Sequence, residues 1–146
     1  MFATNALDSE PLPLYGDGRH VRDWLHVDDH CSGIELVLRE GEPGEIYNVA
    51  ANEEHENAEL ARLIVDHLHA DASLIRQVED RPGHDRRYSL ETTKLRGLGW
   101  APRREWEDGI RTTIDWYHDN RDWWETIKRS DGFREFYERQ YAARLA

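Results

Sequence analysis

Three short segments carry side chains that could bind a nucleotide diphosphate. Residues 11–25 hold Tyr15 and, after a glycine-containing turn, Arg22; residues 80–88 form a loop with three arginines and a histidine; and Asn48 is a polar amide within an otherwise apolar stretch. Arginine is a bidentate partner of phosphate, and an aromatic ring can stack on a base. In an acidic chain, the same loop could instead form salt bridges at the surface. The residue types alone leave both interpretations open.

The sequence lacks the patterns that would predict a cofactor, a metal ion or a catalytic group. A dinucleotide site needs a glycine-rich turn between a strand and a helix, and neither G-x-G-x-x-G nor G-x-x-G-x-x-G occurs. No tyrosine is followed four residues later by a lysine, and no cysteines and histidines have zinc spacing. We therefore expect no catalytic, cofactor-binding or metal-binding residues in this chain.

Composition narrows the class of protein. The chain has 30 acidic and 19 basic residues and a formal net charge of -11, which would repel a nucleic acid. No apolar run approaches the ~20 residues of a membrane span. Cys31 is the single cysteine, so no internal disulfide can form, and we expect a cytoplasmic protein with Cys31 buried as a small apolar residue. The surplus of carboxylates over very few lysines predicts a halophilic source, with an ordinary acidic cytoplasmic protein as the alternative.

The elements that would position these side chains alternate between short strands and helices, which predicts an α/β fold with about five helices. Glu53, Glu54 and Glu56 are expected in a solvated loop, and Asn57 as the N-cap of the helix that follows. Residues 2–8 are predicted to be the end of a helix begun before Met1. Strands are predicted at 11–15, 22–26, 45–50 and 74–78, and helices at 27–38, 57–69, 90–97, 104–118, 121–128 and 132–143.

In this order, the segments resemble the extended short-chain dehydrogenase/reductase superfamily, and within it the dTDP-glucose 4,6-dehydratases. The resemblance covers essentially the whole chain, and RPGHDRRY at 81–88 is its most specific motif. UDP-sugar epimerases and decarboxylases are the alternative family. They share the stretches that correspond to YGDG at 15–18 and RDW at 22–24 but differ at the 81–88 loop. The other motifs are FATNAL at 2–7, PLPLYGDG at 11–18, RDWLHVDDH at 22–30, GEIYN at 44–48, LGW at 98–100, the Trp123–Trp124 pair and FYERQY at 136–141. His26 departs from the usual tyrosine, and Glu91 from the usual aspartate.

The resemblance implies roles for individual residues. A thymine and ribose pocket would be lined by Pro13, Leu14 and Tyr15, and Arg22 would hold the diphosphate. The cradle for the nucleotide would be completed by Asn48, Asp80, Arg81, Pro82, Gly83 and His84. In the full-length family, NAD oxidises the sugar and the dehydration follows. The resemblance places the NAD-binding Rossmann half and the catalytic residues before the first residue of this chain.

We therefore expect residues 1–146 to be the C-terminal nucleotide-sugar-binding region of such an enzyme, truncated at its N-terminus. This region would bind a dTDP-sugar without catalysis of its own. One alternative is a non-catalytic module that binds nucleotide sugars or pairs with a separately encoded Rossmann half. Another is an inactive remnant that self-associates through an exposed apolar face. The chain alone is expected neither to bind NAD nor to dehydrate dTDP-glucose.

Overall fold

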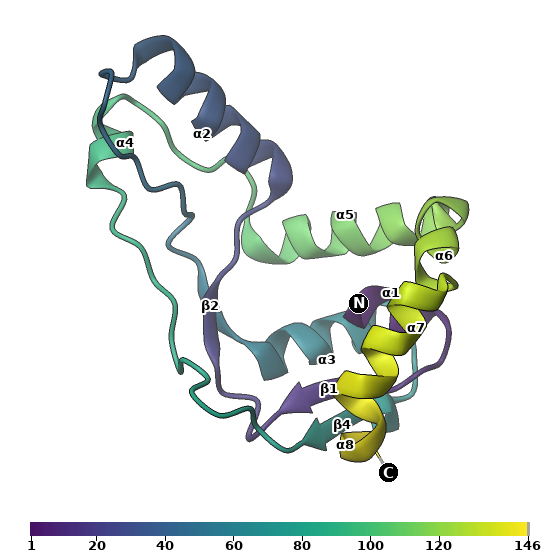
Figure 1. Ribbon diagram of the computed structural model, residues 1–146. Helices are drawn as coiled ribbons and strands as arrows, with labels where there is room; N and C mark the ends of the chain where they lie inside the picture. Colours follow the sequence, from purple (N-terminus) through teal and green to yellow (C-terminus); the bar gives the residue numbers. More distant parts are fainter. Residues whose placement is uncertain (146) are drawn as a thin grey trace.

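Two small sheets and the helices around them form the protein in the computed structural model, which describes residues 1–145 (Figure 1). The predicted α/β class is confirmed, although the short helices make the number larger than the expected five. The strands are β1 (Leu12–Tyr15), β2 (Val21–Asp23), β3 (Glu54–Glu56) and β4 (Ile75–Val78). The helices are α1 (Phe2–Leu7), α2 (Val27–Glu40), α3 (Asn57–His67), η1 (Ala72–Leu74), α4 (Thr93–Gly97), α5 (Trp106–Asp119), α6 (Arg121–Lys128), α7 (Asp131–Tyr137), η2 (Glu138–Ala142) and α8 (Ala143–Leu145).

The two sheets pair strands that are distant in sequence. β1 runs parallel to β4, with Tyr15 opposite Val78, and β2 runs antiparallel to β3. A parallel pair requires a crossover, and here the crossover contains β2, α2, β3 and α3. As a result, the loop that follows β4 starts beside the end of β1.

The hydrophobic core lies where α1, α3 and α5 pack over β1 (Figure 1). Leu12, Val65 and Ile114 are its most deeply buried members. The apolar spacing predicted for α3 and α5 corresponds to this packing, because residues three and four apart lie on one face of a helix. These elements form the rigid base on which the cavity described below is built.

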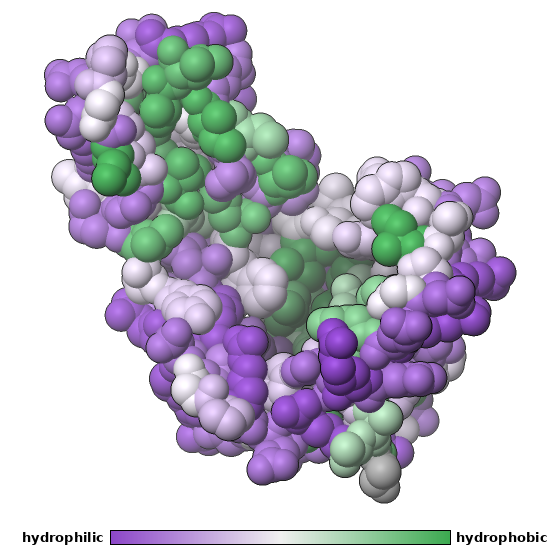
Figure 2. All heavy atoms as spheres, in the orientation of Figure 1, coloured by the Kyte–Doolittle hydropathy of each residue, from purple (hydrophilic) through white to green (hydrophobic). Residues whose placement is uncertain are grey.

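Helix α2 lies apart from that core, together with α4 and the segment between α4 and α5 (Figure 1). Its apolar residues Val27, Ile34 and Leu38 are 64%, 51% and 84% exposed, and Figure 2 shows a continuous apolar surface over this part of the molecule. Cys31 is also exposed, so the expectation that it is buried is wrong. The helix predicted from the apolar spacing of residues 27–38 is confirmed, but no other described element covers this face.

Three local predictions are also wrong. Residues 45–50 form no strand, because no neighbouring strand supplies the hydrogen bonds that one needs. The acidic segment expected as a solvated loop contains β3 instead, since β2 pairs with it. The N-cap of α3 is Glu56 rather than Asn57, and Glu56 and Glu59 form a capping box.

Among residues 1–145, no helix combines the length and apolar character needed to cross a membrane.

Candidate functional site

A cavity of about 660 Å³ lies at the edge of the sheet where β1 and β4 end. Its apolar side is formed by α1, α3 and α5, including Ile64 and Ile114, and its polar side carries cationic and aromatic groups. Ligands of α/β proteins bind outside the carboxyl ends of parallel strands. Six of the predicted nucleotide-binding residues line this cavity, namely Pro13, Leu14, Tyr15, Arg22, Arg81 and His84.

The local backbone explains why these residues meet. Gly16 and Gly18 have φ values of +57° and +76°, a region that favours glycine, so the chain turns sharply after Tyr15. A Cβ atom on Gly18 would lie 2.6 Å from Leu14 Cδ2, so the turn also packs too closely for a side chain. The chain then enters β2, which carries Arg22. The parallel β4 delivers the loop from Asp80 onward to the same edge.

Arg22 is half-buried and is bound by neutral acceptors. Its NH1 donates to the carbonyl of Val21 at 2.7 Å, and its NH2 donates to the carbonyl of Asp85 at 3.0 Å. The same NH2 lies 2.9 Å from Nε2 of His84, and the guanidinium lies 4.1 Å from the ring centre of Tyr88. None of its contacts is a carboxylate among the described residues, so its positive charge is available to an anion in the cavity.

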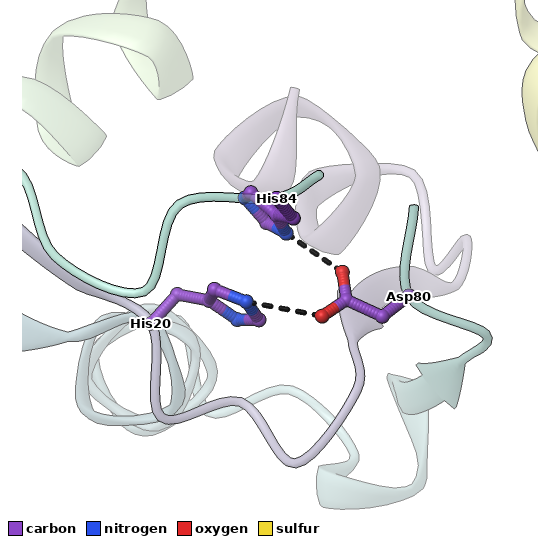
Figure 3. A group of neighbouring side chains, drawn as sticks. All are labelled: His20, Asp80 and His84. Carbon is purple, nitrogen blue, oxygen red and sulfur yellow. Dashed lines mark hydrogen bonds and ion pairs between the residues drawn. The ribbon is translucent and has the colours of Figure 1, made fainter. Parts of the chain in front are cut away.

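Behind Arg22, two histidines meet one carboxylate (Figure 3). Asp80 Oδ1 lies 2.7 Å from His84 Nδ1, and Asp80 Oδ2 lies 3.1 Å from His20 Nε2. The imidazole rings stack with their centres 3.8 Å apart. The hydrogen bond from His84 lowers the pKa of Asp80. Burial, and then the neighbouring His84, lower the pKa of His20, so an ionised Asp80 and a neutral His20 are favoured.

His20, Asp80 and His84 are also the residues of the described chain whose ligand atoms are close enough together to hold a metal ion. The remaining ring nitrogens do not suit a metal. A ligating histidine normally donates its second N–H to an acceptor, whereas His84 Nε2 faces the donor Arg22 and His20 Nδ1 is buried without a partner. The geometry instead suits a hydrogen-bonded network that ends on Arg22.

Tyr15 lies between the network and the C-terminal helices. Its ring is edge-on to His84, with centres 5.6 Å apart, and its hydroxyl accepts a hydrogen bond from Gln140 Nε2 at 2.7 Å. The guanidinium of Arg81 lies 5.8 Å from the centre of the same ring. Burial and the adjacent Tyr15 raise the pKa of Tyr141, which keeps that phenol neutral at the cavity wall.

The other two arginines of the loop form salt bridges. Arg86 binds both carboxylate oxygens of Asp17, at 2.7 and 3.0 Å, and Arg87 binds those of Glu54, at 2.5 and 2.7 Å. The interpretation of this loop as a nucleotide-binding segment therefore suits Arg81, and its interpretation as a salt-bridged surface loop suits Arg86 and Arg87. Arg81 faces the cavity, while Arg86 and Arg87 tie the loop to the β1–β2 turn and to β3.

Four of the predicted residues do not line the cavity. Asn48 is exposed and donates from Nδ2 to the carbonyl of Glu91 at 2.9 Å. Pro82 and Gly83 are exposed at the tip of the loop. Asp80 acts behind the cavity, through His84. For all ten predicted residues, nucleotide contact stays a prediction.

Sequence reasoning missed His20 and Gln140. His20 sits among turn residues and belongs to no motif that predicts chemistry. Gln140 lies in the FYERQY segment, whose resemblance carried no assigned role. A signal for Gln140 was its amide in an aromatic segment, but its contact with Tyr15 spans most of the chain and no local pattern reports it.

Residues 1–113 match the family model described as GDP-mannose 4,6 dehydratase. The chain is 49% identical over 130 residues to a dTDP-glucose 4,6-dehydratase of Streptomyces antibioticus, which covers 88% of this chain and 39% of that protein. A crystal structure of a dTDP-glucose 4,6-dehydratase from Streptomyces venezuelae, with NAD and TYD bound, is 52% identical with a TM-score of 0.82. The superposition covers 87% of this chain and 40% of that one.

A more distant similarity connects the chain to an epimerase. The UDP-glucose 4-epimerase of Thermotoga maritima, solved with UDP-glucose, is 27% identical over 81% of this chain and 38% of that one, with a TM-score of 0.75. The dehydratases are thus more similar than this epimerase in both sequence and structure. In each comparison, the chain spans about two fifths of the relative's length.

Proposed function

This chain belongs to the GDP-mannose 4,6-dehydratase family, and we propose that it is the nucleotide-sugar-binding portion of a dTDP-glucose 4,6-dehydratase. The observation that carries the proposal is the convergence of Tyr15, Arg22, Arg81 and His84 on one cavity. A dTDP group needs a surface for its base and cations for its diphosphate, and these side chains supply both. Arg22 matters most, because its contacts leave its charge uncompensated in a chain of net charge -11.

The geometry of Arg22 supports binding of a diphosphate rather than a weak surface contact. Three of its five N–H groups are held by the two carbonyls and by His84, so the guanidinium is oriented before a ligand arrives. Its remaining N–H groups can meet phosphate oxygens without losing the contacts that position it. Preorganisation of this kind raises affinity by lowering the entropy lost on binding.

NAD would not find its usual site in this part of the fold. Two strand–helix junctions of the described residues, Trp24-Leu25-His26 before α2 and the direct join of β3 to α3, contain no glycine, and the third, residues 79–92 between β4 and α4, contains Gly83 alone. A pyrophosphate needs close backbone approach at such a junction. We therefore propose that NAD and the dehydration chemistry come from the remainder of the family fold, and that this chain contributes the substrate pocket.

The exposed apolar face of α2 supports the same division between this chain and the remainder of the family fold. Val27, Ile34 and Leu38 form a stripe that would remain in contact with water unless another element covered it. We propose that the remainder of the family fold packs here, on the same polypeptide or on a separate one. Self-association through this face is the competing proposal. Sedimentation of the chain over a range of concentrations separates them, because only self-association gives a mass that rises with concentration.

Calorimetric titration with dTDP tests the proposed pocket. A charge-assisted hydrogen bond contributes ~1.5–3 kcal/mol, so Arg22→Ala should weaken dTDP binding by roughly ten- to a hundredfold. Arg22→Lys should restore part of the loss, since lysine keeps the charge but not the planar fork. Tyr15→Ala should cost less and should reduce the preference for dTDP over inorganic diphosphate.

The matched control is Arg87→Ala, which removes an arginine of the same loop that is bound to Glu54. This variant should bind dTDP like the wild type. Equal losses in the two alanine variants would mean a general charge effect and would contradict the site. Tighter binding of UDP than of dTDP by the wild type would favour the epimerase and decarboxylase alternative.

A further inference from the structure

His20 belongs to the network with Asp80 and His84 but does not line the cavity, so the pocket alone does not explain its role. His20 is 2% exposed and lies on the turn between β1 and β2, where its backbone carbonyl accepts a hydrogen bond from the amide of Asn57 at 2.9 Å. The first residue of α3 thus holds this histidine in place. Its side chain reaches Asp80, which lies on the loop after β4 (Figure 3).

The contacts determine which ring nitrogen of His84 carries the proton. A guanidinium can only donate, so Nε2 of His84, 2.9 Å from Arg22 NH2, must be an unprotonated acceptor. The neutral ring then carries its proton on Nδ1, where Asp80 Oδ1 accepts at 2.7 Å. If the proton moved to Nε2, two donors would face each other and the contact with Arg22 would be lost.

The same reasoning assigns His20. Asp80 is ionised and accepts only, so His20 Nε2 donates to Oδ2. The other nitrogen, Nδ1, is buried without a partner, and a proton there would be an unsatisfied buried donor. His20 and His84 thus bind opposite oxygens of one carboxylate, and the amide of Arg81 completes the set by donating to Oδ1 at 2.8 Å. Glycine at position 16 allows the approach, because a Cβ there would lie 3.3 Å from Asp80 Oδ2.

We propose that His20 is a positioning residue for the nucleotide site. By binding Asp80 and stacking on His84, it holds His84 in the Nδ1–H form and so keeps Arg22 aimed at the cavity. The inference rests on the proposed function for the identity of the ligand, but the protonation pattern can be measured on the ligand-free chain. His20 touches no ligand in this arrangement; its effect passes through Asp80 and His84.

Two substitutions separate the two contacts of His20. His20→Phe keeps a ring to stack on His84 and removes the donor to Asp80, whereas His20→Gln keeps a donor of similar reach and removes the ring. His20→Phe loses one hydrogen bond to the charged Asp80, which acts on the ligand only indirectly. We therefore expect dTDP binding to weaken by about three- to tenfold in this variant. His20→Gln should stay within about twofold of the wild type. The control is His118→Phe, at a histidine whose side chain is 67% exposed.

Nitrogen NMR of the imidazole rings provides the readout that a general loss of packing would not change. In the wild-type chain, His84 should show a protonated Nδ1 and a bare Nε2, and His20 the reverse. His20→Phe should mix the two forms of His84, while His20→Gln and His118→Phe should leave them unchanged. A wild-type His84 protonated on Nε2, or a His20→Phe variant with an unchanged His84 and unchanged affinity, overturns the proposal.

The wild-type spectrum decides the protonation pattern even if His20→Phe does not fold. A wild-type chain that shows this pattern but does not bind dTDP would contradict the proposed function. It would not contradict the assignment of His20 as the residue that orients His84. The two ideas therefore fail in different experiments.

Discussion

At the scale of single residues, the arginines near the cavity differ in their partners. Arg87 binds Glu54 through two hydrogen bonds, and Ser89 donates to the same carboxylate at 2.7 Å. Arg22 has no carboxylate partner among residues 1–145 and lines the cavity. Paired arginines contribute to the stability of the loop, whereas Arg22 is free to contribute to binding.

The Glu54–Arg87 pair predicts a dependence of stability on pH. The hydrogen bonds from Arg87 and then Ser89 lower the pKa of Glu54 to about 2 from its usual 4.5. A carboxyl group whose pKa is lower in the folded state stabilises the fold above its unfolded pKa, and this contribution is lost as the pH falls from about 4.5 to about 2. Glu54→Gln should therefore lower the melting temperature at pH 6, and the difference from the wild type should shrink below about pH 4.5.

Thermal melts of both proteins between pH 6 and pH 3 check this expectation. Glu40→Gln is the control, because Glu40 takes part in no ion pair within residues 1–145. A difference between wild type and Glu54→Gln that stays constant over this range would mean that the pair does not shift the titration of Glu54.

At the scale of elements, one buried carboxylate joins α2 to the segment before α5. Asp29 is 3% exposed, and its two oxygens accept hydrogen bonds from the amides of Arg103 and Arg104 at 3.0 and 3.1 Å. Nearby, the indole N–H of Trp100 donates to Ser32 at 3.0 Å. Because α2 lies apart from the main core, we expect these hydrogen bonds to contribute strongly to its attachment to the segment before α5.

Removing that carboxylate should loosen α2. Asp29→Ala leaves two backbone N–H groups without an acceptor, which should lower the free energy of unfolding by about 2–3 kcal/mol. Asp29→Asn keeps one acceptor and should cost roughly half as much. Urea unfolding followed by circular dichroism measures both.

The neighbouring Asp28 provides a matched control. Its side chain is 66% exposed and pairs with Arg104 at the surface, a contact worth at most about 1 kcal/mol. Asp28→Asn should therefore change stability little. If Asp28→Asn and Asp29→Ala were equally destabilising, the link between α2 and the segment before α5 would have no special role.

At the scale of the whole molecule, the charge of -11 predicts that salt stabilises the fold. Most ion pairs of the structure lie at the surface, where each contributes little and loses little on screening. Repulsion among the surplus carboxylates is long-ranged, and it is reduced as the Debye length falls from about 30 Å at 0.01 M to about 3 Å at 1 M salt. The melting temperature should rise over this range of KCl concentration.

Thermal melts at increasing KCl concentration check the salt prediction. Most of the rise should occur below about 1 M, because screening is then nearly complete. A melting temperature that stays constant or falls would contradict the halophilic interpretation. A rise that begins only above 1 M would point to strengthened burial of apolar surface instead of screening.

Local patterns in the sequence determined the features that depend on neighbouring residues. The spacing of apolar residues predicted α3 and α5, and Gly16 and Gly18 predicted the turn between β1 and β2. The resemblance implies that the loop from Asp80 to His84 belongs to a nucleotide site, and this stays a prediction. The predictions of the helices and of the turn depend on residues close together in the sequence, so no distant partner was needed to make them.

The tertiary structure decided what depends on distant partners. Parallel pairing of β1 with β4 brings Asp80 beside the end of β1, and only that proximity gives His20 a carboxylate to bind. Whether an arginine forms a salt bridge likewise depends on which carboxylates fold next to it, as Arg87, paired with Glu54, and Arg22, which contacts no carboxylate of residues 1–145, show. Residues 45–50 have the composition of a strand but form none, because a strand exists only where another strand completes its hydrogen bonds.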